Sequence, residues 1–409
     1  MTATTTTCCI VGGGPAGVVL GYLLARAGVA VVVLEKHADF LRDFRGDTIH
    51  PSTARLMDEL GLGEQFAALP MRHSDTVRLV TDDREYTIAD FRRIPGRHTL
   101  GFLPQWDFLN FMTQQGKRYD RFDLRMEADA FDVIRDGSRV TGVRVRDAQG
   151  EVSDIRADLV VAADGRDSTI RAAAGLEVVS HGAPIDVLWF SISRHDSDPE
   201  TAFGRLSRGH LLIMIDRGDH WQAGYVIGKG ERDTLRDVGI DAFRSRIGAL
   251  APFLSDRTQQ IGSWDDVRLL RVQINRLRRW WQPGLLFIGD AAHAMSPVAG
   301  VGINLAVQDA VAAARILAQP LREGDVSGWH LARVQARRTL PTVLTQQAQR
   351  LVQDRVLSRI VSGQAGGKAP LAFRVLDRVP ALRAVPAWII GHGVLPEHAP
   401  PAADGASSR

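Results

Sequence analysis

Three glycines near the start of the chain are spaced for contact with a phosphate group. Gly12, Gly14 and Gly17 follow a short apolar run at residues 8–11 and open a helical pattern that continues to residue 27. The first glycine of such a loop permits a tight turn, and the second lets backbone N–H groups approach a pyrophosphate. The third allows close packing of helix on strand, and the helix N-terminus faces the anion. The spacing, with Ala16 inside the loop, predicts a dinucleotide-binding site.

The end of the next apolar run narrows the choice of dinucleotide. Residues 29–34 are expected to form a second buried strand, which closes on Glu35 and is followed by Lys36. A carboxylate there is placed to accept hydrogen bonds from an adenosine ribose, and it disfavours a 2′-phosphate. NADP is therefore not expected in this pocket, which leaves NAD or FAD. Both residues are assigned to the cofactor site.

Two further motifs each follow an apolar strand. Asp164-Gly165 comes directly after residues 159–163, and Gly289-Asp290 comes directly after residues 285–288. The second motif leads through His293 and Pro297 to a stretch at residues 300–304 that opens a long helical pattern. Together with the N-terminal glycines, and in this order, these motifs resemble those of the class A FAD-dependent aromatic monooxygenases, the family of para-hydroxybenzoate hydroxylase. The resemblance covers residues 8–330.

The resemblance implies roles for the motif residues. Asp290 resembles the carboxylate that hydrogen-bonds the ribityl hydroxyls of FAD, and Asp164 resembles a residue that supports the pyrophosphate region. Free N–H groups at the start of the helix near Gly300 would stabilise negative charge at the flavin. Arg45 and Gln105 resemble residues that contact FAD. The full cofactor set is Gly12, Gly14, Ala16, Gly17, Glu35, Lys36, Arg45, Gln105, Asp164, Gly289, Asp290, Gly300, Gly302, Ile303 and Asn304.

The same resemblance implies a reaction. FAD would be bound non-covalently, reduced by NADPH or NADH as a transient co-substrate, and converted by O2 to a flavin C4a-hydroperoxide. That species would hydroxylate a small aromatic or polyketide-like substrate, while the protein positions the ring and excludes water. No side chain is named as the catalytic acid or base. Pro297 is expected beside the flavin, and His293 is expected to hydrogen-bond within its turn rather than to catalyse.

Two alternatives stay open from the sequence alone. An FAD-dependent reductase of a prenyl or other lipid-like substrate would share these motifs without inserting oxygen. The apolar segment at residues 376–395 leaves contact with lipid open as well. A non-catalytic flavin-binding sensor would also keep the motifs, but it would not oxidise NAD(P)H with any substrate.

The order of the expected elements indicates an α/β fold. A Rossmann-like FAD-binding domain of the para-hydroxybenzoate hydroxylase type is expected at residues 1–73, 95–182 and 265–330. An inserted β-sheet substrate domain is expected at residues 74–94 and 183–264, followed by C-terminal helices at 331–396 and a disordered tail at 397–409. Trp189, Met214, Trp221 and Tyr225 are candidates for the walls of the substrate site.

Composition limits the partners and the location. The 50 basic and 47 acidic residues of the 409 leave a net charge of +3 and are interspersed, so no nucleic-acid partner is expected. No apolar run reaches the roughly 18 residues of a membrane span, and the first residues lack signal-peptide features. The adjacent Cys8 and Cys9 cannot build a disulfide framework. We expect a cytoplasmic monomer or homodimer that acts on a small molecule and O2 and has no metal site.

Overall fold

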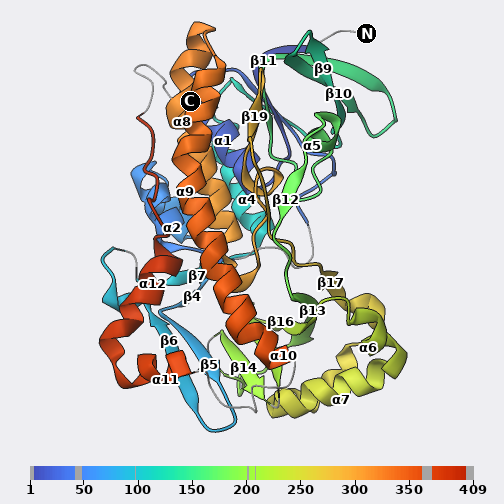
Figure 1. The fold of residues 1–409 in the computed structure, drawn as a ribbon, viewed down its shortest axis with the longest axis vertical. Coiled ribbons are helices and arrows are strands. Elements are labelled where there is room, and N and C mark those ends of the chain that lie inside the picture. The colour runs from blue at the N-terminus through green and yellow to red at the C-terminus, as the bar shows by residue number, and fades with distance from the viewer. Residues whose placement is uncertain are drawn as a thin grey trace.

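Two β-sheets and two long helices organise the molecule (Figure 1). The computed structural model describes residues 4–41, 48–96, 98–199, 202–207, 209–361 and 371–401. A largely parallel sheet occupies one half and a largely antiparallel sheet the other. The helix α8 (Gly302–Glu323) belongs to the first half, whereas α9 (Gly328–Val352) runs from the first half towards the second. The predicted α/β fold with C-terminal helices is confirmed.

Apolar runs of the sequence form the central strands of the first sheet. β20 (Leu285–Phe287), β11 (Val152–Ala162), β1 (Thr4–Val11), β2 (Val31–Leu34) and β8 (Phe122–Arg125) pair in this order, all parallel. β19 (Trp281–Gln282) adds an antiparallel edge. The register pairs Val11 with both Leu34 and Ala162, and Ala162 with Phe287. The residues that follow β1, β2, β11 and β20 therefore meet along one edge of the sheet, where open α/β sheets bind ligands.

The two faces of this sheet are covered differently. α1 (Pro15–Arg26), α4 (Gln105–Gly116) and α8 pack on one face, and the hairpin of β9 (Asp129–Asp136) and β10 (Arg139–Arg146) covers the other. Side chains alternate along β1, so Cys8 lies on the helical side and Cys9 on the hairpin side. Burial raises the pKa of Cys9 to about 12, which keeps this thiol protonated.

The second sheet is formed by seven strands. Their order is β17 (Arg268–Leu270), β13 (Ile185–Ser193), β16 (His220–Gly228), β15 (His210–Asp216), β14 (Phe203–Ser207), β5 (Thr76–Val80) and β6 (Glu85–Asp90). Neighbours are antiparallel except β14 and β5. α7 (Ile240–Leu250), which follows α6 (Arg232–Val238), packs on one face. β17 extends the sheet beyond the predicted boundary at residue 264 because it pairs with residues 187–189.

Short elements connect the two sheets. β3 (Thr48–Ile49), β7 (Leu100–Phe102) and β4 (Arg72–Ser74) form a small sheet, and β12 (Val178–Ser180) pairs with β18 (Asn275–Leu277). The short α-helices are α2 (Pro51–Glu59), α3 (Gly63–Ala67) and α5 (Thr169–Ala173). Single 3₁₀ turns are η1 (Phe91–Arg93), η2 (Pro252–Leu254), η3 (Thr258–Gln260), η4 (Trp264–Asp266), η5 (Gly289–Ala291) and η6 (Val298–Gly300).

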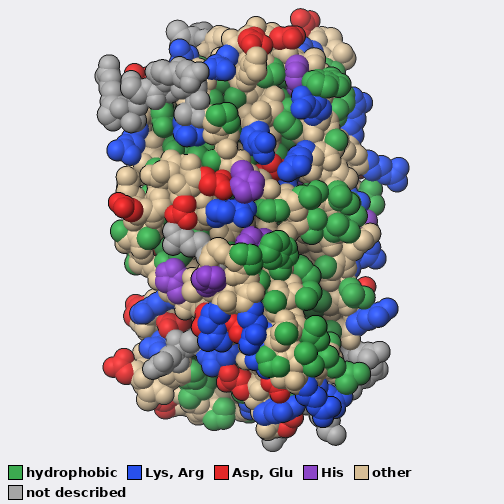
Figure 2. Space-filling model, turned by 90° about the vertical axis from the view of Figure 1, so that its left-hand side faces the viewer, with side chains coloured by type: hydrophobic (Ala, Val, Ile, Leu, Met, Phe, Trp, Pro, Cys, Tyr) green, Lys and Arg blue, Asp and Glu red, His purple; other side chains and the backbone are tan. Residues whose placement is uncertain are grey.

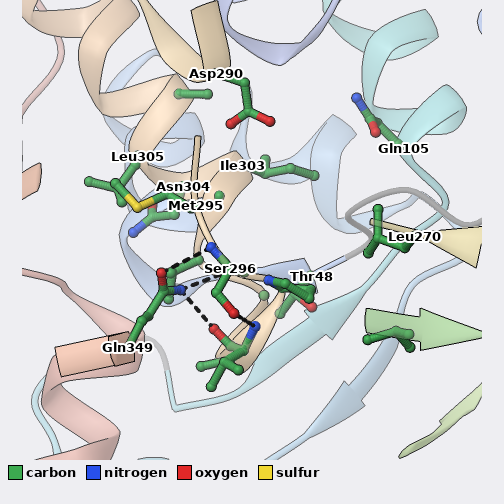
Figure 3. A pocket seen from close by; sticks show the side chains of 18 of the residues that line it. Thr48, Gln105, Leu270, Asp290, Met295, Ser296, Ile303, Asn304, Leu305 and Gln349 are labelled. Atoms are coloured by element: carbon green, nitrogen blue, oxygen red, sulfur yellow. Dashed lines mark hydrogen bonds between the residues drawn. The ribbon is translucent and has the colours of Figure 1, made fainter. Parts of the chain in front are cut away.

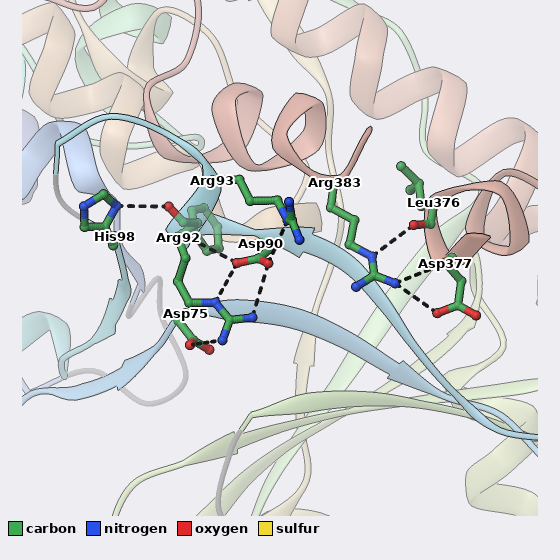
Figure 4. A network of polar contacts seen from close by, with 9 residues as sticks. Asp75, Asp90, Arg92, Arg93, His98, Leu376, Asp377 and Arg383 are labelled. Atoms are coloured by element: carbon green, nitrogen blue, oxygen red, sulfur yellow. Dashed lines mark hydrogen bonds and ion pairs between the residues drawn. The ribbon is translucent and has the colours of Figure 1, made fainter. Parts of the chain in front are cut away.

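The C-terminal helices are fastened to the β5–β6 hairpin. After η7 (Gln353–Leu357) and α10 (Ser358–Val361) come α11 (Leu371–Arg378), η8 (Pro380–Arg383) and α12 (Ala384–Gly391). Asp377 of α11 accepts a hydrogen bond from Arg383 (Figure 4). It also pairs with Arg84 of the hairpin at 3.2 Å. At the end of β6, hydrogen bonds from Arg92 hold the pKa of the Asp90 carboxyl below its usual value. Polar contacts thus hold α11 and η1 in place.

The beginning of the expected disordered tail is tied to the fold. Glu397 is 2% exposed, and its carboxylate pairs with Arg337 at 2.6 Å and with Arg315 at 3.1 Å. His398 then pairs with Glu59 of α2 at 2.6 Å. The expectation of disorder from residue 397 is therefore corrected for residues 397–401, since long-range ion pairs outweigh the local composition. The rest of the tail, residues 402–409, lies outside the described residues.

Candidate functional site

A cavity of about 1640 Å³ lies between the ligand-binding edge of the parallel sheet and the inner face of the second sheet. Its walls include Gly12 after β1, Glu35 after β2, Asp164 after β11 and Asp290 after β20. The sheet register explains why segments so far apart in sequence reach the same space. The three sequence motifs therefore converge on one site.

The glycines of the N-terminal loop have separate functions. A Cβ on Gly12 would lie 2.4 Å from the Ala163 carbonyl oxygen, and one on Gly17 would lie 1.9 Å from the Gly12 carbonyl oxygen. Both positions therefore need glycine for close backbone packing. A Cβ on Gly14, in contrast, would meet no described atom within 4 Å. Gly14 lines the cavity, so the loop leaves room there for a bulky group.

The N-terminus of α1 has the features of an anion-binding site. Gly14 is its N-cap, Pro15 begins the helix, and the first turn carries no acidic residue. Among the described residues no side chain caps this end. Free N–H groups at a helix N-terminus carry partial positive charge. A pyrophosphate fits this position because it supplies the acceptors that the protein does not.

Glu35 is held at the cavity wall by backbone contacts. Its Oε2 accepts a hydrogen bond from the Gly13 N–H at 3.0 Å, and its Oε1 accepts one from the His37 N–H at 3.1 Å. The side chain remains 13% exposed, and Lys36 lines the cavity beside it. An oriented carboxylate at this point suits hydroxyl groups of a ribose.

The two Asp-containing motifs face the cavity in different ways. Asp164 accepts hydrogen bonds from Ser168 Oγ at 2.6 Å and from the Ile170 N–H at 3.0 Å, so it anchors the start of α5. Burial raises the pKa of Asp164, although these hydrogen bonds oppose the shift. Asp290 pairs with Arg166 at 3.0 Å, and both side chains are more than a quarter exposed. Asp290 is therefore the more accessible acceptor for ligand hydroxyls.

A second helix N-terminus opens on the same cavity. α8 starts at Gly302, its first turn has no acidic residue, and no described side chain caps it. Just before it, Ala299 and Gly300 both have φ of 63°, and a Cβ on Gly300 would lie 2.5 Å from Thr48 Oγ1. A non-glycine residue in this region costs on the order of 1 kcal/mol. This strained turn directs the chain so that the N-terminus of α8 lies at the cavity wall.

The predicted residues around α8 lie together (Figure 3). Pro297, Gly300, Gly302, Ile303 and Asn304 all line the cavity. The side-chain oxygen of Asn304 accepts hydrogen bonds from the hydroxyls of Ser52 and Thr53 of α2, at 2.8 and 3.0 Å. Asn304 thus fixes the start of α2 against α8 while bordering the site.

Gln105, Gly289 and Arg45 were also predicted to contact the cofactor, and they differ in their position relative to the cavity. Gln105, at the start of α4, lines the cavity (Figure 3). Gly289 has φ of 58°, and a Cβ there would lie 3.1 Å from the Ala16 Cβ, so it allows β20 and α1 to approach closely. Arg45 lies outside the described residues. Taken together, the two uncapped helix N-termini and the acidic acceptors between them fit FAD.

The predicted partner of His293 is corrected. Its Nε2 contacts Asp309 Oδ2 on α8 at 2.6 Å rather than a group within its own turn. Arg338 of α9 donates to the other oxygen of Asp309 at 2.8 Å, and all three side chains are at most 1% exposed. Burial alone would raise the pKa of Asp309, but His293 and Arg338 hold it below its usual value. This buried network joins the segment after η5 to α8 and α9, so the geometry gives His293 a structural role.

The inner face of the second sheet forms the other part of the cavity. Trp189 of β13 lines it, together with aliphatic side chains of β15 and β16 such as Ile213 and Val226. A Cβ on Gly224, the cross-strand partner of Trp189, would lie 2.9 Å from the indole. Gly224 therefore leaves room for the ring to lie over β16. The wall is apolar and aromatic, as expected for an aromatic substrate.

Two predicted wall residues are on the opposite face of that sheet. Trp221 packs near α7 and donates to Asp198 at 2.8 Å, and Tyr225 hydrogen-bonds His210 at 2.7 Å. Neither lines the cavity, and this is a correction. Met214 borders the cavity, but its fully buried side chain packs in the same cluster as Trp221. Strand alternation places these three side chains away from Trp189.

The cavity opens beside an apolar surface. Leu344 and Val352 of α9 and Ile389 of α12 line the cavity and are 40%, 38% and 49% exposed. More large apolar side chains are exposed nearby on η8 and α12, including Leu382, Val385 and Trp388. Figure 2 shows hydrophobic side chains gathered on part of the face that carries α11 and α12. The mouth therefore suits an apolar molecule.

Sequence analysis missed several residues of the site. Arg166 pairs with Asp290, and Gln349 of α9 hydrogen-bonds the segment next to Pro297. Arg166 lies two residues after Asp164, so its proximity to the motif was a usable signal. Gln349 had a weaker signal, because Gln346, Gln349 and Gln353 repeat at helical spacing.

One helical stretch among the described residues, Val298–Glu323, is long and apolar enough to cross a membrane, but 78% of its apolar window is buried inside the fold. It includes α8, whose burial explains its composition. In the described part of the chain, no three His, Cys, Asp or Glu side chains are grouped to hold a metal ion.

Comparison with known proteins defines the class. The FAD binding domain family matches residues 5–348. The chain is 34% identical over 383 residues to 6-methylpretetramide 4-monooxygenase of Streptomyces rimosus. The matched region covers 91% of this chain and 89% of that protein. The chain therefore belongs to the family of para-hydroxybenzoate hydroxylase-like flavoprotein monooxygenases. It is an FAD-dependent oxidoreductase with monooxygenase activity, as the motifs predicted.

Solved structures show the same fold. PqsL of Pseudomonas aeruginosa matches with a TM-score of 0.73 at 21% identity, covering 89% of this chain and all of that one. The anhydrotetracycline hydroxylase OxyS of Streptomyces rimosus matches with a TM-score of 0.72 at 20% identity, covering 95% of this chain and 76% of that one.

Proposed function

We propose that this monooxygenase hydroxylates a fused-ring phenolic polyketide at an aromatic carbon, using NADPH or NADH. The observation that carries the proposal is the size and lining of the cavity. Its volume of about 1640 Å³ exceeds the common 300–1,000 Å³ of small-molecule sites. Such a volume leaves room for a multi-ring substrate beside FAD. The 34% identity to 6-methylpretetramide 4-monooxygenase supports the same substrate class.

The chain's own residues supply binding and orientation. Gly12, Gly14 and the N-terminus of α1 would hold the pyrophosphate, Glu35 the ribose, and Asp290 the ribityl hydroxyls. When bound, FAD supplies the reaction with O2 after reduction by NAD(P)H. The N-terminus of α8 would stabilise negative charge that develops beside it.

The substrate-binding part acts mainly by shape and exclusion of water. Trp189 offers a flat apolar face on which an aromatic ring can stack. Leu344, Val352 and Ile389 would remove water from an apolar substrate as it enters through the mouth. An apolar substrate seated in this site would also keep water away from the reacting groups.

The test uses the FAD-loaded protein, NADPH and in parallel NADH, and three probes: a pretetramide-type polycyclic phenol, para-hydroxybenzoate and a geranylgeranyl lipid. We expect the polycyclic phenol to stimulate NADPH oxidation and to gain one oxygen atom. Stimulation by the small phenol alone would refute the substrate class. Reduction of the lipid without O2 would favour the reductase, and no stimulation by any probe would favour the sensor.

Location and assembly belong to the same proposal. A cytoplasmic location is consistent with the two buried free cysteines, Cys8 and Cys9, and we expect a monomer or homodimer there. Analytical ultracentrifugation of the FAD-loaded protein tests the assembly, and a larger oligomer would contradict it.

A further inference from the structure

A row of glutamines on α9 and its continuation contacts the segment that leads into α8. Gln346, Gln349 and Gln353 lie three and four residues apart, so they share one side of the helix. All three are at most 5% exposed. Long polar side chains are rarely buried without a hydrogen-bonding purpose. The row faces residues 294–298. This segment includes Pro297, which forms part of the cavity wall (the Pro297 wall).

Gln349 makes the central contacts (Figure 3). Its Oε1 accepts from the Ser296 N–H at 3.1 Å, and its Nε2 donates to the carbonyl oxygens of Ser296 and Val298 at 2.9 and 3.1 Å. Each end of the amide has a partner of the opposite kind, which fixes its orientation. The side chain thus forms hydrogen bonds with backbone N–H and C=O groups of an irregular segment. Without it, these groups would be buried with no hydrogen-bond partner from this side chain.

The flanking glutamines extend the same contact. Gln353 Nε2 donates to Ser296 Oγ at 2.6 Å, and Gln346 Nε2 donates to the carbonyl oxygens of Asn275 and Ala294 at 2.8 and 3.1 Å. Gln353 begins the π-helical turn η7, a feature often found at functional sites. Only Gln349 of the three borders the cavity itself. Gln349 is therefore the member that couples α9 to the site.

We propose that Gln349 is a positioning residue for the flavin. Through Ser296 and Val298 it fixes the Pro297 wall and the strained turn at Ala299 that leads into α8. The α8 N-terminus and the Pro297 wall can then keep one geometry relative to the bound ring. This inference rests on FAD binding and not on the substrate class, so it is tested with FAD alone.

The test compares Gln349→Met with Gln335→Met on the FAD-loaded protein. Gln335 lies on the same helix and makes a matched pair of contacts, from the Trp280 N–H at 3.1 Å and to the Arg278 carbonyl oxygen at 2.9 Å, away from the cavity. The readouts are backbone hydrogen exchange in residues 294–300, the visible circular dichroism of bound FAD, and the rate of FAD dissociation. Thermal unfolding reports general damage in both variants.

We expect Gln349→Met to speed exchange in residues 294–300 and FAD dissociation by about tenfold, equivalent to about 1.4 kcal/mol, and to alter the flavin spectrum. Gln335→Met should lower thermal stability without these changes. The proposal is overturned if both variants give the same flavin signals, or if Gln349→Met leaves them unchanged. Should Gln349→Met not fold, Gln353→Met, which removes only the contact to Ser296 Oγ, must still speed exchange in that segment. Wild-type exchange would reject the proposal.

Discussion

Substitution of Gly14 separates FAD binding from folding. Its backbone angles, φ −75° and ψ −178°, are open to alanine, and the added Cβ would meet no described atom within 4 Å. A glycine-to-alanine change at a compatible position alters stability by about 1 kcal/mol or less. The apo form of Gly14→Ala should therefore unfold at nearly the wild-type temperature.

The same methyl group would occupy the space that a pyrophosphate needs. A hydrogen bond to a charged group contributes about 1.5–3 kcal/mol, so losing one or two of them weakens FAD binding by about 3 kcal/mol. That loss corresponds to an increase in Kd of about 100-fold. The expected result is a stable protein that binds FAD poorly.

The assay pairs thermal unfolding of the apoprotein with FAD titration followed by quenching of flavin fluorescence. Gly17→Ala is the contrasting variant, because its Cβ would lie 1.9 Å from the Gly12 carbonyl oxygen and should destabilise the apoprotein itself. If Gly14→Ala binds FAD within about threefold of the wild type, a difference of less than 1 kcal/mol, the assignment of this loop to the pyrophosphate is refuted.

Three further predictions concern other parts of the site. Trp189→Ala should raise KM for the aromatic substrate about tenfold, whereas Trp221→Phe, behind the sheet, should cost about 1 kcal/mol of stability and leave KM unchanged; equal effects on KM would contradict the assignment of faces. Asp309→Asn should destabilise the fold by about 3 kcal/mol, measured by urea unfolding, because it removes the charge 2.8 Å from the buried Arg338 and leaves only Glu397, at 3.8 Å, as its charged partner; a neutral result would disprove the network's structural role. His50, the N-cap residue of α2, is fully buried between the carbonyl oxygens of Ile390 and Gly300. Burial lowers its pKa, so the unfolded state binds more protons and stability should fall as pH drops below about 6.5. His50→Gln should show a weaker decline in stability over that range, and parallel wild-type and variant profiles would rule this out.

Local spacing led us to expect the glycine loop and Glu35 at one edge of the sheet, and the family resemblance led us to expect Asp164 and Asp290 beside them. The glycine loop, Glu35 and Asp290 each follow a strand directly, so the parallel register that aligns the strand ends also aligns these residues. Asp164 follows the same rule. Their positions could be inferred because each depends on only a few neighbouring residues.

The substrate half depends on information that the local sequence lacks. Both faces of β16 are buried, one at the cavity and one against α7, so apolar residues occur on both and alternation cannot identify the inner face. Trp221 and Tyr225 were assigned to the wrong face for this reason. The partner of His293 is 16 residues away, and the contact from Gln349 to Ser296 spans 53 residues. Such pairings depend on how the helices pack.

Oxygen transfer is the central claim, and isotopic labelling tests it most directly. The FAD-loaded protein, NADPH and a pretetramide-type polycyclic phenol would be incubated under ¹⁸O₂ and the product analysed by mass spectrometry. The account predicts that the product gains one ¹⁸O atom at an aromatic carbon and that none is gained when the label is in water. A product labelled from water, or one reduced without any gain of oxygen, would contradict it.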